Sequence, residues 1–241
     1  MITAILTLYK RPHVLQEQID SLKNQTCPPE KIMIWRNFAE GYTFPEHIKE
    51  DKSIIIIDSS HNFGVWARFA LGLLANTEYV CVFDDDTIPG KKWFENCLNT
   101  MKEVNGLLGT IGVVFNDAPF YSIKRRFGWD GNNDNTVKVD IVGHSWFFKR
   151  EWLKFLWETT PDYSMFLRAG EDIGFSWALQ KNGIHTYVPP HPSNDLEMFG
   201  SIPCKAWSYG TESVGISVTG LNNFDDVYKY YISKGFTILN Q

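Results

Sequence analysis

The sequence predicts an α/β fold, a single domain in which helices flank a mixed, mainly parallel sheet. Over the first 105 residues, short apolar runs rich in β-branched residues alternate with amphipathic segments, as in a doubly wound sheet. The apolar fraction of 44% and the aromatic fraction of 15% favour a folded globule over a disordered chain. Because no repeat or linker interrupts the pattern, we expect one domain over residues 1–241.

Four strands and three helices are predicted in the first half, residues 1–105. Apolar runs that each end in polar residues predict strands at 2–8, 32–35, 54–57 and 79–83. Apolar residues at helical spacing predict helices near 15–22, 65–75 and 91–104. In the helix at 65–75, the residues expected to face the core are Trp66, Phe69, Ala70, Leu73 and Leu74. Ligands of such a sheet bind along the carboxyl ends of its strands.

The second half, residues 106–204, is less regular. Its predicted strands are 109–115, a half-exposed stretch around 137–141, and a short strand that ends at 189–191. Its predicted helices lie near 150–159 and 171–182. The expected loops are 116–135, the segment that starts at Gly143, and 192–209, which is placed to fold over a site. A C-terminal extension, 205–241, contains a predicted helix at 225–233.

Three consecutive carboxylates, Asp84, Asp85 and Asp86, directly follow the strand at 79–83. Adjacent like charges at the lip of a cleft repel one another unless a cation lies between them. A divalent metal, held by oxygen ligands and shared with a phosphate, is the simplest such cation. The alternative is a solvated acidic turn in which Asp86 caps the helix that begins near Lys91.

Charge and cysteine placement limit the expected partners. The formal net charge is −5 and no long Lys/Arg run occurs, so we expect neither nucleic acid nor an anionic membrane as a partner. No apolar run of about 18 residues is present to span a bilayer, and residues 1–8 read as a strand rather than a signal peptide. The cysteines lack metal-binding spacing and read as small buried hydrophobes in a reducing, cytoplasmic compartment: Cys27, Cys81, Cys97 and Cys204.

A second acidic pair, Glu171 and Asp172, opens a predicted helix after the Asp triplet. This ordered set resembles the nucleotide-sugar glycosyltransferases of GT-A fold. Residues 6–12 (LTLYKRP) are similar to the start of family 2-like and exostosin-like members. The resemblance covers residues 2–195 and implies a Rossmann-like domain, with a nucleotide-binding half at 1–105 and an acceptor half at 106–204.

The resemblance implies metal-dependent transfer of a sugar from a nucleoside diphosphate sugar, expected to be a UDP-sugar, to a hydroxyl of a glycan or glycoconjugate. Mn²⁺ or Mg²⁺ stabilises the charge that develops on the diphosphate leaving group. By this match Asp86 is the main metal ligand. Asp84 and Asp85 contribute to the same site, near the ribose or a metal-bound water. His191 is a candidate third ligand, since Mn²⁺ tolerates an imidazole, or else a loop histidine beside two prolines. His144 is a candidate for contact with the donor or acceptor.

Such enzymes hold the nucleotide against the ends of the first three strands. Arginine can bind a phosphate through two hydrogen bonds, and a tyrosine ring can stack on a pyrimidine. Taken singly, Arg11 could be a solvated loop residue and Arg68 could pair with a surface acid. Arg36 stands where the exostosin-like pattern has Asn, which leaves a uridine preference open. The matching positions are Thr7, Tyr9, Arg11, Asn37, Asn62 and Arg68.

Asp172 is the predicted catalytic base, because an acceptor hydroxyl must lose its proton as it attacks the anomeric carbon. Glu171 is expected to orient acceptor hydroxyls. The structural alternative is that both acids cap the helix and favour its positive end. Inversion of configuration is expected, and a retaining exostosin-like reaction is the alternative. Three tryptophans are candidates for stacking on an acceptor: Trp129, Trp146 and Trp207.

Two other functional classes remain open. A sugar-phosphate nucleotidyltransferase also uses a doubly wound fold and an acid-bound metal, but it usually carries a Gly-rich loop after the first strand, and residues 9–12 contain no glycine. A non-catalytic glycan-binding domain would not need both an acidic metal site and a second acidic pair. The sequence leaves the oligomeric state open.

Overall fold

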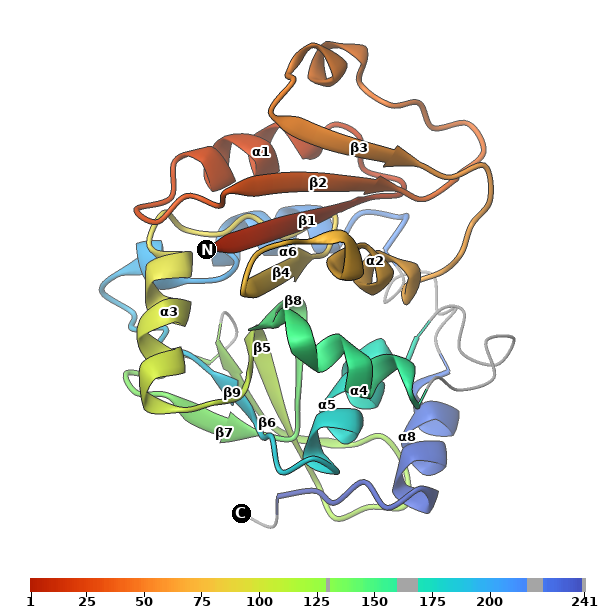
Figure 1. Ribbon diagram of the computed structural model, residues 1–241. Coiled ribbons are helices and arrows are strands. Elements are labelled where there is room, and N and C mark those ends of the chain that lie inside the picture. The colour runs from red at the N-terminus through yellow and green to blue at the C-terminus, as the bar shows by residue number, and fades with distance from the viewer. Residues whose placement is uncertain (129–130, 160–168, 216–222, 240–241) are drawn as a thin grey trace.

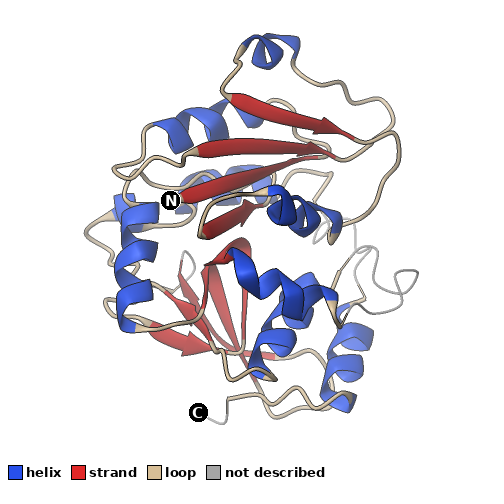
Figure 2. Ribbon diagram, viewed as in Figure 1, coloured by secondary structure: helices blue, strands red, loops and turns tan. Residues whose placement is uncertain are grey.

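The computed structural model describes residues 1–128, 131–159, 169–215 and 223–239. Helices cover both faces of one continuous sheet (Figures 1 and 2). The predicted α/β class with a mixed sheet is confirmed. No helix of the described residues combines the length and the apolar character needed to cross a membrane.

The first half of the sheet is parallel. In spatial order its strands are β3 (Ile54–Asp58), β2 (Lys31–Arg36), β1 (Ile2–Leu8) and β4 (Tyr79–Phe83). Their apolar runs are near-continuous, as expected for parallel strands that are covered on both faces. The carboxyl ends of these strands lie together, on the right in Figure 1.

The second half of the sheet mixes both directions. β8 (Ile141–Lys149) lies antiparallel between β4 and β5 (Leu107–Phe115) and so joins the two halves. β9 (Thr186–Val188) is parallel to β5, whereas β7 (Val137–Val139) and β6 (Ile123–Gly128) are antiparallel to β9 and β5.

The α-helices are α1 (Leu15–Lys23), α2 (Ala67–Ala70), α3 (Trp93–Glu103), α4 (Leu153–Trp157), α5 (Glu171–Gln180), α6 (Pro203–Gly210) and α8 (Phe224–Ser233). Short 3-10 helices are η1 (Glu46–Glu50), η2 (Leu71–Leu74), η3 (Arg150–Trp152) and η4 (Leu196–Met198).

Two apolar clusters, one on each face of the sheet, form the core. Along β4, Val80 and Val82 belong to the cluster that includes residues of α2, α4, α5 and α8. Cys81 and Phe83 belong to the other cluster, with residues of α1 and α3. This alternation follows from the two-residue period of a strand. The buried end of β4 therefore fixes where the following Asp triplet lies.

Several segments differ from the sequence-based expectation. In place of the single helix predicted at 65–75, the chain forms α2 followed by the 3-10 helix η2. Leu73 and Leu74, which were expected to face the core, are therefore 48% and 70% exposed. The predicted loop at 116–135 contains β6, whose charged residues hide the apolar alternation of a strand. The predicted loop at Gly143 lies inside β8, and 192–209 contains η4 and most of α6. Cys204, expected in the core, is exposed on α6.

Candidate functional site

A cleft of about 250 Å³ is lined by both predicted acidic groups. Asp84, Asp85 and Asp86 reach it from the end of β4, and Glu171 and Asp172 reach it from the first turn of α5. These two groups are far apart in the sequence. They meet because β8, which pairs with β4, also contacts α5.

Arg68 connects the two acidic groups. Its guanidinium donates from Nη1 to Asp84 Oδ1 and from Nη2 to Glu171 Oε1, the latter at 2.8 Å. The group also lies over the ring of Trp146, 4.7 Å from the ring centroid. With its side chain only 5% exposed, Arg68 is a buried cation inside the cleft rather than a partner of a surface acid.

Arg11 holds the rest of the triplet. It lies 2.5 Å from Asp85 through Nη1 and 3.6 Å from Asp86 through Nη2. Its Nε donates to the backbone oxygen of Tyr209 at 3.1 Å, and the same atom is 3.4 Å from Glu212. Arg11 is 5% exposed, so it is a buried link between the triplet and α6 rather than a solvated loop residue.

The turn that carries the triplet is held by buried polar groups. The Gln18 side chain, on α1, donates to the backbone oxygens of Asp84 (2.7 Å) and Thr87 (3.0 Å). The backbone oxygen of His144 accepts from the Asp84 amide at 2.9 Å and from the Thr87 hydroxyl at 3.0 Å. These bonds fix the carboxylates at the end of β4.

His144 takes an unusual backbone conformation to do this. Its φ of +63° is the only positive value of a non-glycine residue in the described part of the chain. The register between β8 and β5 shifts at this point, because an extra residue of β8 forms a bulge opposite Thr110. The bulge brings the imidazole beside the triplet, with Nδ1 3.7 Å from Asp86 Oδ1.

Asp84, Asp86 and His144 form a group that could hold a metal ion, with potential ligand atoms all within 4.8 Å of one another. Burial opposes the charged imidazole, but Asp86 and Asp84 outweigh it and raise the pKa of His144. Burial also opposes the charged form of Asp86, but His144 and Arg11 lower the pKa of that carboxyl. Both shifts favour the charged forms, the Asp86 carboxylate and the His144 imidazolium.

The charges of the cleft are unbalanced. Of the described residues that line it, five are carboxylates and two are arginines. Burial and the neighbouring acids raise the pKa of Asp85, although Arg11 opposes this shift. A further cation would therefore stabilise the ionised cleft.

His191 was a candidate third ligand, but it lies away from the cleft, in the core. It is fully buried, with its ring against Phe199 and Trp93 at centroid distances of 4.8 and 5.7 Å. Its Nδ1 is 2.7 Å from the Pro189 oxygen, and Nε2 accepts from the Gly200 amide at 3.2 Å. With both nitrogens engaged and burial lowering its pKa to about 4, His191 is a neutral core histidine. His144, rather than His191, lies beside Asp84 and Asp86.

Three of the predicted nucleotide-binding residues form one hydrogen-bonded group. Asn37 donates to Asn62 at 2.8 Å, and Asn62 donates to the Tyr9 hydroxyl at 3.0 Å. The Thr7 hydroxyl, at the end of β1, is buried and makes no hydrogen bond with described residues. These side chains come from the carboxyl ends of β1 to β3, as expected.

Asp172 lines the cleft without a cation bound to it in the described structure. Its Oδ1 accepts from the amide of the next residue, Ile173, at 2.7 Å, but α5 has Gly170 at its N-cap and no side-chain cap, so Asp172 does not cap the helix. Burial nevertheless raises the pKa of Asp172 to about 6, and the hydrogen bond only opposes this shift. Burial also raises the pKa of Glu171, against the effect of Arg68. A carboxylate that titrates near neutral pH is suited to accept a proton.

α6 and the turn after it border the cleft, whereas the sequence predicts only a loop at 192–209 that folds over a site. The Glu17 carboxylate, on α1, binds Lys205 and accepts from the Tyr209 hydroxyl at 2.5 Å. Glu212 lies 2.9 Å from His13. Gly210 and Gly215 line the cleft. Of the predicted tryptophans, Trp146 lines the cleft, Trp207 is 53% exposed on α6, and Trp129 lies outside the described residues.

Comparison with known proteins identifies one family and several solved structures of similar fold. The profile of glycosyl transferase family 2 matches residues 3–157. Similar solved structures include GalNAc-T7 with UDP, GalNAc and Mn²⁺, with TM-score 0.60 and 11% identity over 79% of this chain and 42% of that chain. TarS of S. aureus has TM-score 0.55 and 15% identity over 79% of this chain and 36% of that chain.

The chain thus spans less than half of either structure, and at these identities the likeness shows the fold alone. No curated protein gives a significant match.

Proposed function

Because the chain belongs to glycosyl transferase family 2, we propose that it transfers a sugar from a nucleoside diphosphate sugar, with UDP as the nucleotide, to a hydroxyl of a glycan or glycoconjugate. One observation carries the proposal: the Asp84–Asp86 triplet and the Glu171–Asp172 pair line the same cleft. Such a transfer needs a metal site for the diphosphate and a carboxylate that acts as a base.

The residues at the triplet fit a divalent metal. Asp84, Asp86 and His144 supply two oxygen ligands and one nitrogen ligand, a set that suits Mn²⁺ and tolerates Mg²⁺ less well. Asp86 Oδ1 is buried and makes no hydrogen bond with the described residues, so it is a suitable ligand atom. When bound, Mn²⁺ supplies positive charge for the diphosphate leaving group.

Side chains of the protein would supply the base, orient the acceptor and bind the nucleoside. Asp172 takes the proton of the acceptor hydroxyl as that oxygen attacks the anomeric carbon from the face opposite the diphosphate. The bond from that carbon to the diphosphate oxygen breaks in the same step, and this single displacement inverts the configuration. Glu171, fixed by Arg68, orients the acceptor. Tyr9, Asn37 and Asn62 bind the nucleoside at the ends of the parallel strands.

A screen of nucleotide sugars tests the proposal without knowledge of the acceptor. The protein is incubated with Mn²⁺ and each sugar nucleotide in turn, and products are separated by chromatography. Slow release of a nucleoside diphosphate that EDTA stops is the expected result. Pyrophosphate release from a nucleoside triphosphate and a sugar phosphate would instead indicate a nucleotidyltransferase. No metal-dependent product from any donor, with Mn²⁺ present and the protein folded, would refute the proposal.

A further inference from the structure

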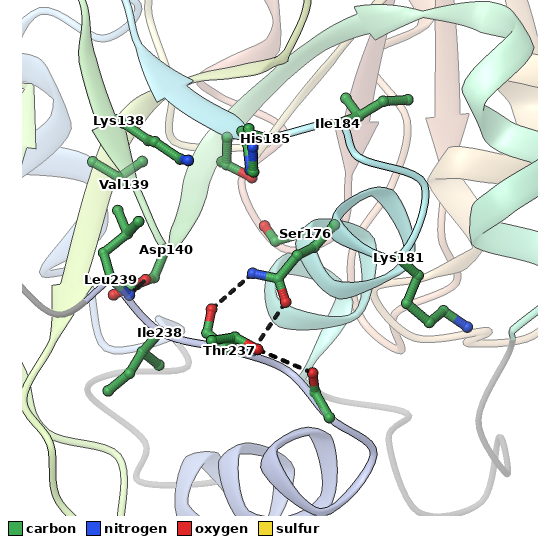
Figure 3. Close-up of a pocket in the computed structure, with 13 residues that line it drawn as sticks. Lys138, Val139, Asp140, Ser176, Lys181, Ile184, His185, Thr237, Ile238 and Leu239 are labelled. Carbon is green, nitrogen blue, oxygen red and sulfur yellow. Dashed lines mark hydrogen bonds between the residues drawn. The ribbon is translucent and has the colours of Figure 1, made fainter.

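A second hollow, of about 430 Å³, adjoins the C-terminal half of α5 (Figure 3). It lies between segments that are distant in the sequence: residues 138–140, α5, residues 184–186 and the C-terminal stretch 235–239. The volume is within the range of small-molecule sites in proteins. None of its lining residues belongs to the acid-lined cleft.

The hollow is pre-formed by bonds to the C-terminal stretch. The Gln180 side chain donates to the Thr237 backbone oxygen at 2.7 Å and accepts from the Thr237 amide at 2.9 Å. Asp140 accepts from the amides of Leu239 (2.5 Å) and Phe115 (2.7 Å), one at each carboxylate oxygen. Both carboxylate oxygens of Asp140 therefore bind backbone amides, and Asp140 is not an ion-pair partner of the lysines in the described structure.

Three basic side chains line the same hollow: Lys138, Lys181 and His185. Lys138 makes no ion pair with any described residue, and Figure 3 shows its ammonium directed toward His185. Burial and the nearby Lys138 both lower the pKa of His185. Lys181 is engaged elsewhere, with its ammonium 3.8 Å from the centroid of the Trp177 ring.

Ser176 provides an independent indication of a ligand. It is 1% exposed, it lines the hollow, and its hydroxyl makes no hydrogen bond with the described residues. Figure 3 shows it on the side of α5 that faces the hollow. A buried hydroxyl without a partner is costly by about 1–3 kcal/mol, so an acceptor group of a ligand would be favoured there.

We propose that this hollow binds a small organic anion, with one phosphate or carboxylate group on an apolar body. The anionic group lies between Lys138, His185 and Ser176. The apolar body packs on Val139, Ile184 and Ile238. The site is independent of the glycosyl transfer proposed above, because its residues are not shared with the cleft.

Phenyl phosphate is a suitable probe, followed by calorimetry and by the NMR signals of the His185 ring. We expect binding that raises the pKa of His185, because a nearby negative charge favours the imidazolium. Benzoate should bind at the same place if the charge rather than the phosphate is recognised. Inorganic phosphate should bind more weakly, since it lacks the apolar body, and neutral phenol should not shift the His185 pKa.

Variants make the test specific. Lys138→Met and Ser176→Ala should each weaken binding by about fivefold or more, equivalent to one hydrogen bond or ion pair of about 1 kcal/mol. Lys102→Met, which removes an exposed charge on α3, is the matched control and should have no effect. Asp86→Asn should also bind normally, which separates this site from the cleft. The proposal is refuted if phenyl phosphate leaves His185 unchanged or binds Lys138→Met as tightly as the native chain.

Discussion

Arg68 Nη2 lies 2.8 Å from Glu171 Oε1, while Nη1 of the same guanidinium contacts Asp84. One side chain from α2 therefore fixes the end of β4 relative to the start of α5. The side chains of Arg68 and Glu171 are 5% and 12% exposed, so solvent screens this contact little. This contact joins the two acidic groups that line the cleft.

Arg68→Met should destabilise the fold strongly. The substitution keeps the apolar stem but leaves Glu171 and the partly buried Asp84 without their cation, and breaking a buried pair typically costs about 3–5 kcal/mol. Urea denaturation followed by circular dichroism measures the loss. Arg36→Met is the control, because its partner Asp58 is 52% exposed and such pairs contribute about 0–1 kcal/mol. Similar losses for both variants would contradict a structural role specific to Arg68.

Asp172→Asn should lower turnover strongly while donor binding is retained. The amide has nearly the same shape but cannot accept the proton, and loss of a general base typically costs about 10²–10⁴-fold in rate. Metal-dependent donor hydrolysis gives the rate, and calorimetry with the nucleoside diphosphate gives the affinity. Asp195→Asn, which alters a partner of Lys92 outside the cleft, is the matched control. A variant with near-native turnover would exclude Asp172 as the base.

The rate should depend on pH with a midpoint near the pKa of Asp172, which burial raises to about 6. Because the base acts only when ionised, kcat/KM should be constant well above this pH and fall as pH decreases through it, by about tenfold per unit. A pH profile of donor hydrolysis at saturating Mn²⁺ is the measurement. An unchanged acid limb in Asp172→Asn would assign the titration to another group.

His144→Asn should weaken Mn²⁺ binding more than Mg²⁺ binding. Asparagine tolerates a positive φ better than alanine does, so the bulge in β8 is expected to survive while the imidazole ligand is lost. Mn²⁺ accepts nitrogen ligands more readily than Mg²⁺, which prefers oxygen. Paramagnetic resonance of free Mn²⁺ gives its affinity, and competition gives that of Mg²⁺. His47→Asn, on the exposed η1 turn, is the control, and equal losses for both metals would count against ligation by His144.

Opposite-charge substitutions at Glu17 and Lys205 test whether α6 closes over the donor. Each single change, Glu17→Lys or Lys205→Glu, should raise the KM for the donor by about fivefold, the effect of about 1 kcal/mol. The double variant should recover most of the loss, since it restores an ion pair. The same exchange of Lys23 and Asp51 is the control. Failure of the double variant to recover would show that α6 acts otherwise.

Much of the first half could be predicted from the sequence. Buried parallel strands require nearly continuous apolar runs, so β1, β2, β3 and β4 were found within one or two residues. Polar residues that follow these strands must share one edge of the sheet. For this reason the sequence predicts that three polar side chains lie close together: Tyr9, Asn37 and Asn62.

The position of His144 could not be predicted in the same way. It depends on β8 lying between β4 and β5 and on a one-residue bulge, and neither leaves a periodic signal in the sequence. Gly143 and His144 interrupt the apolar alternation of β8 and so read as a loop. Contacts between Arg11 and the end of α6 were equally hidden, because they join residues at opposite ends of the chain.

The antiparallel insertion of β8 beside β4 has a consequence for dissecting the chain. A fragment that stopped near residue 105 would lack β8, and the backbone groups of β4 that now pair with it would form an open edge. Exposed apolar edges recruit further strands, so such a fragment should self-associate rather than serve as an isolated nucleotide-binding unit.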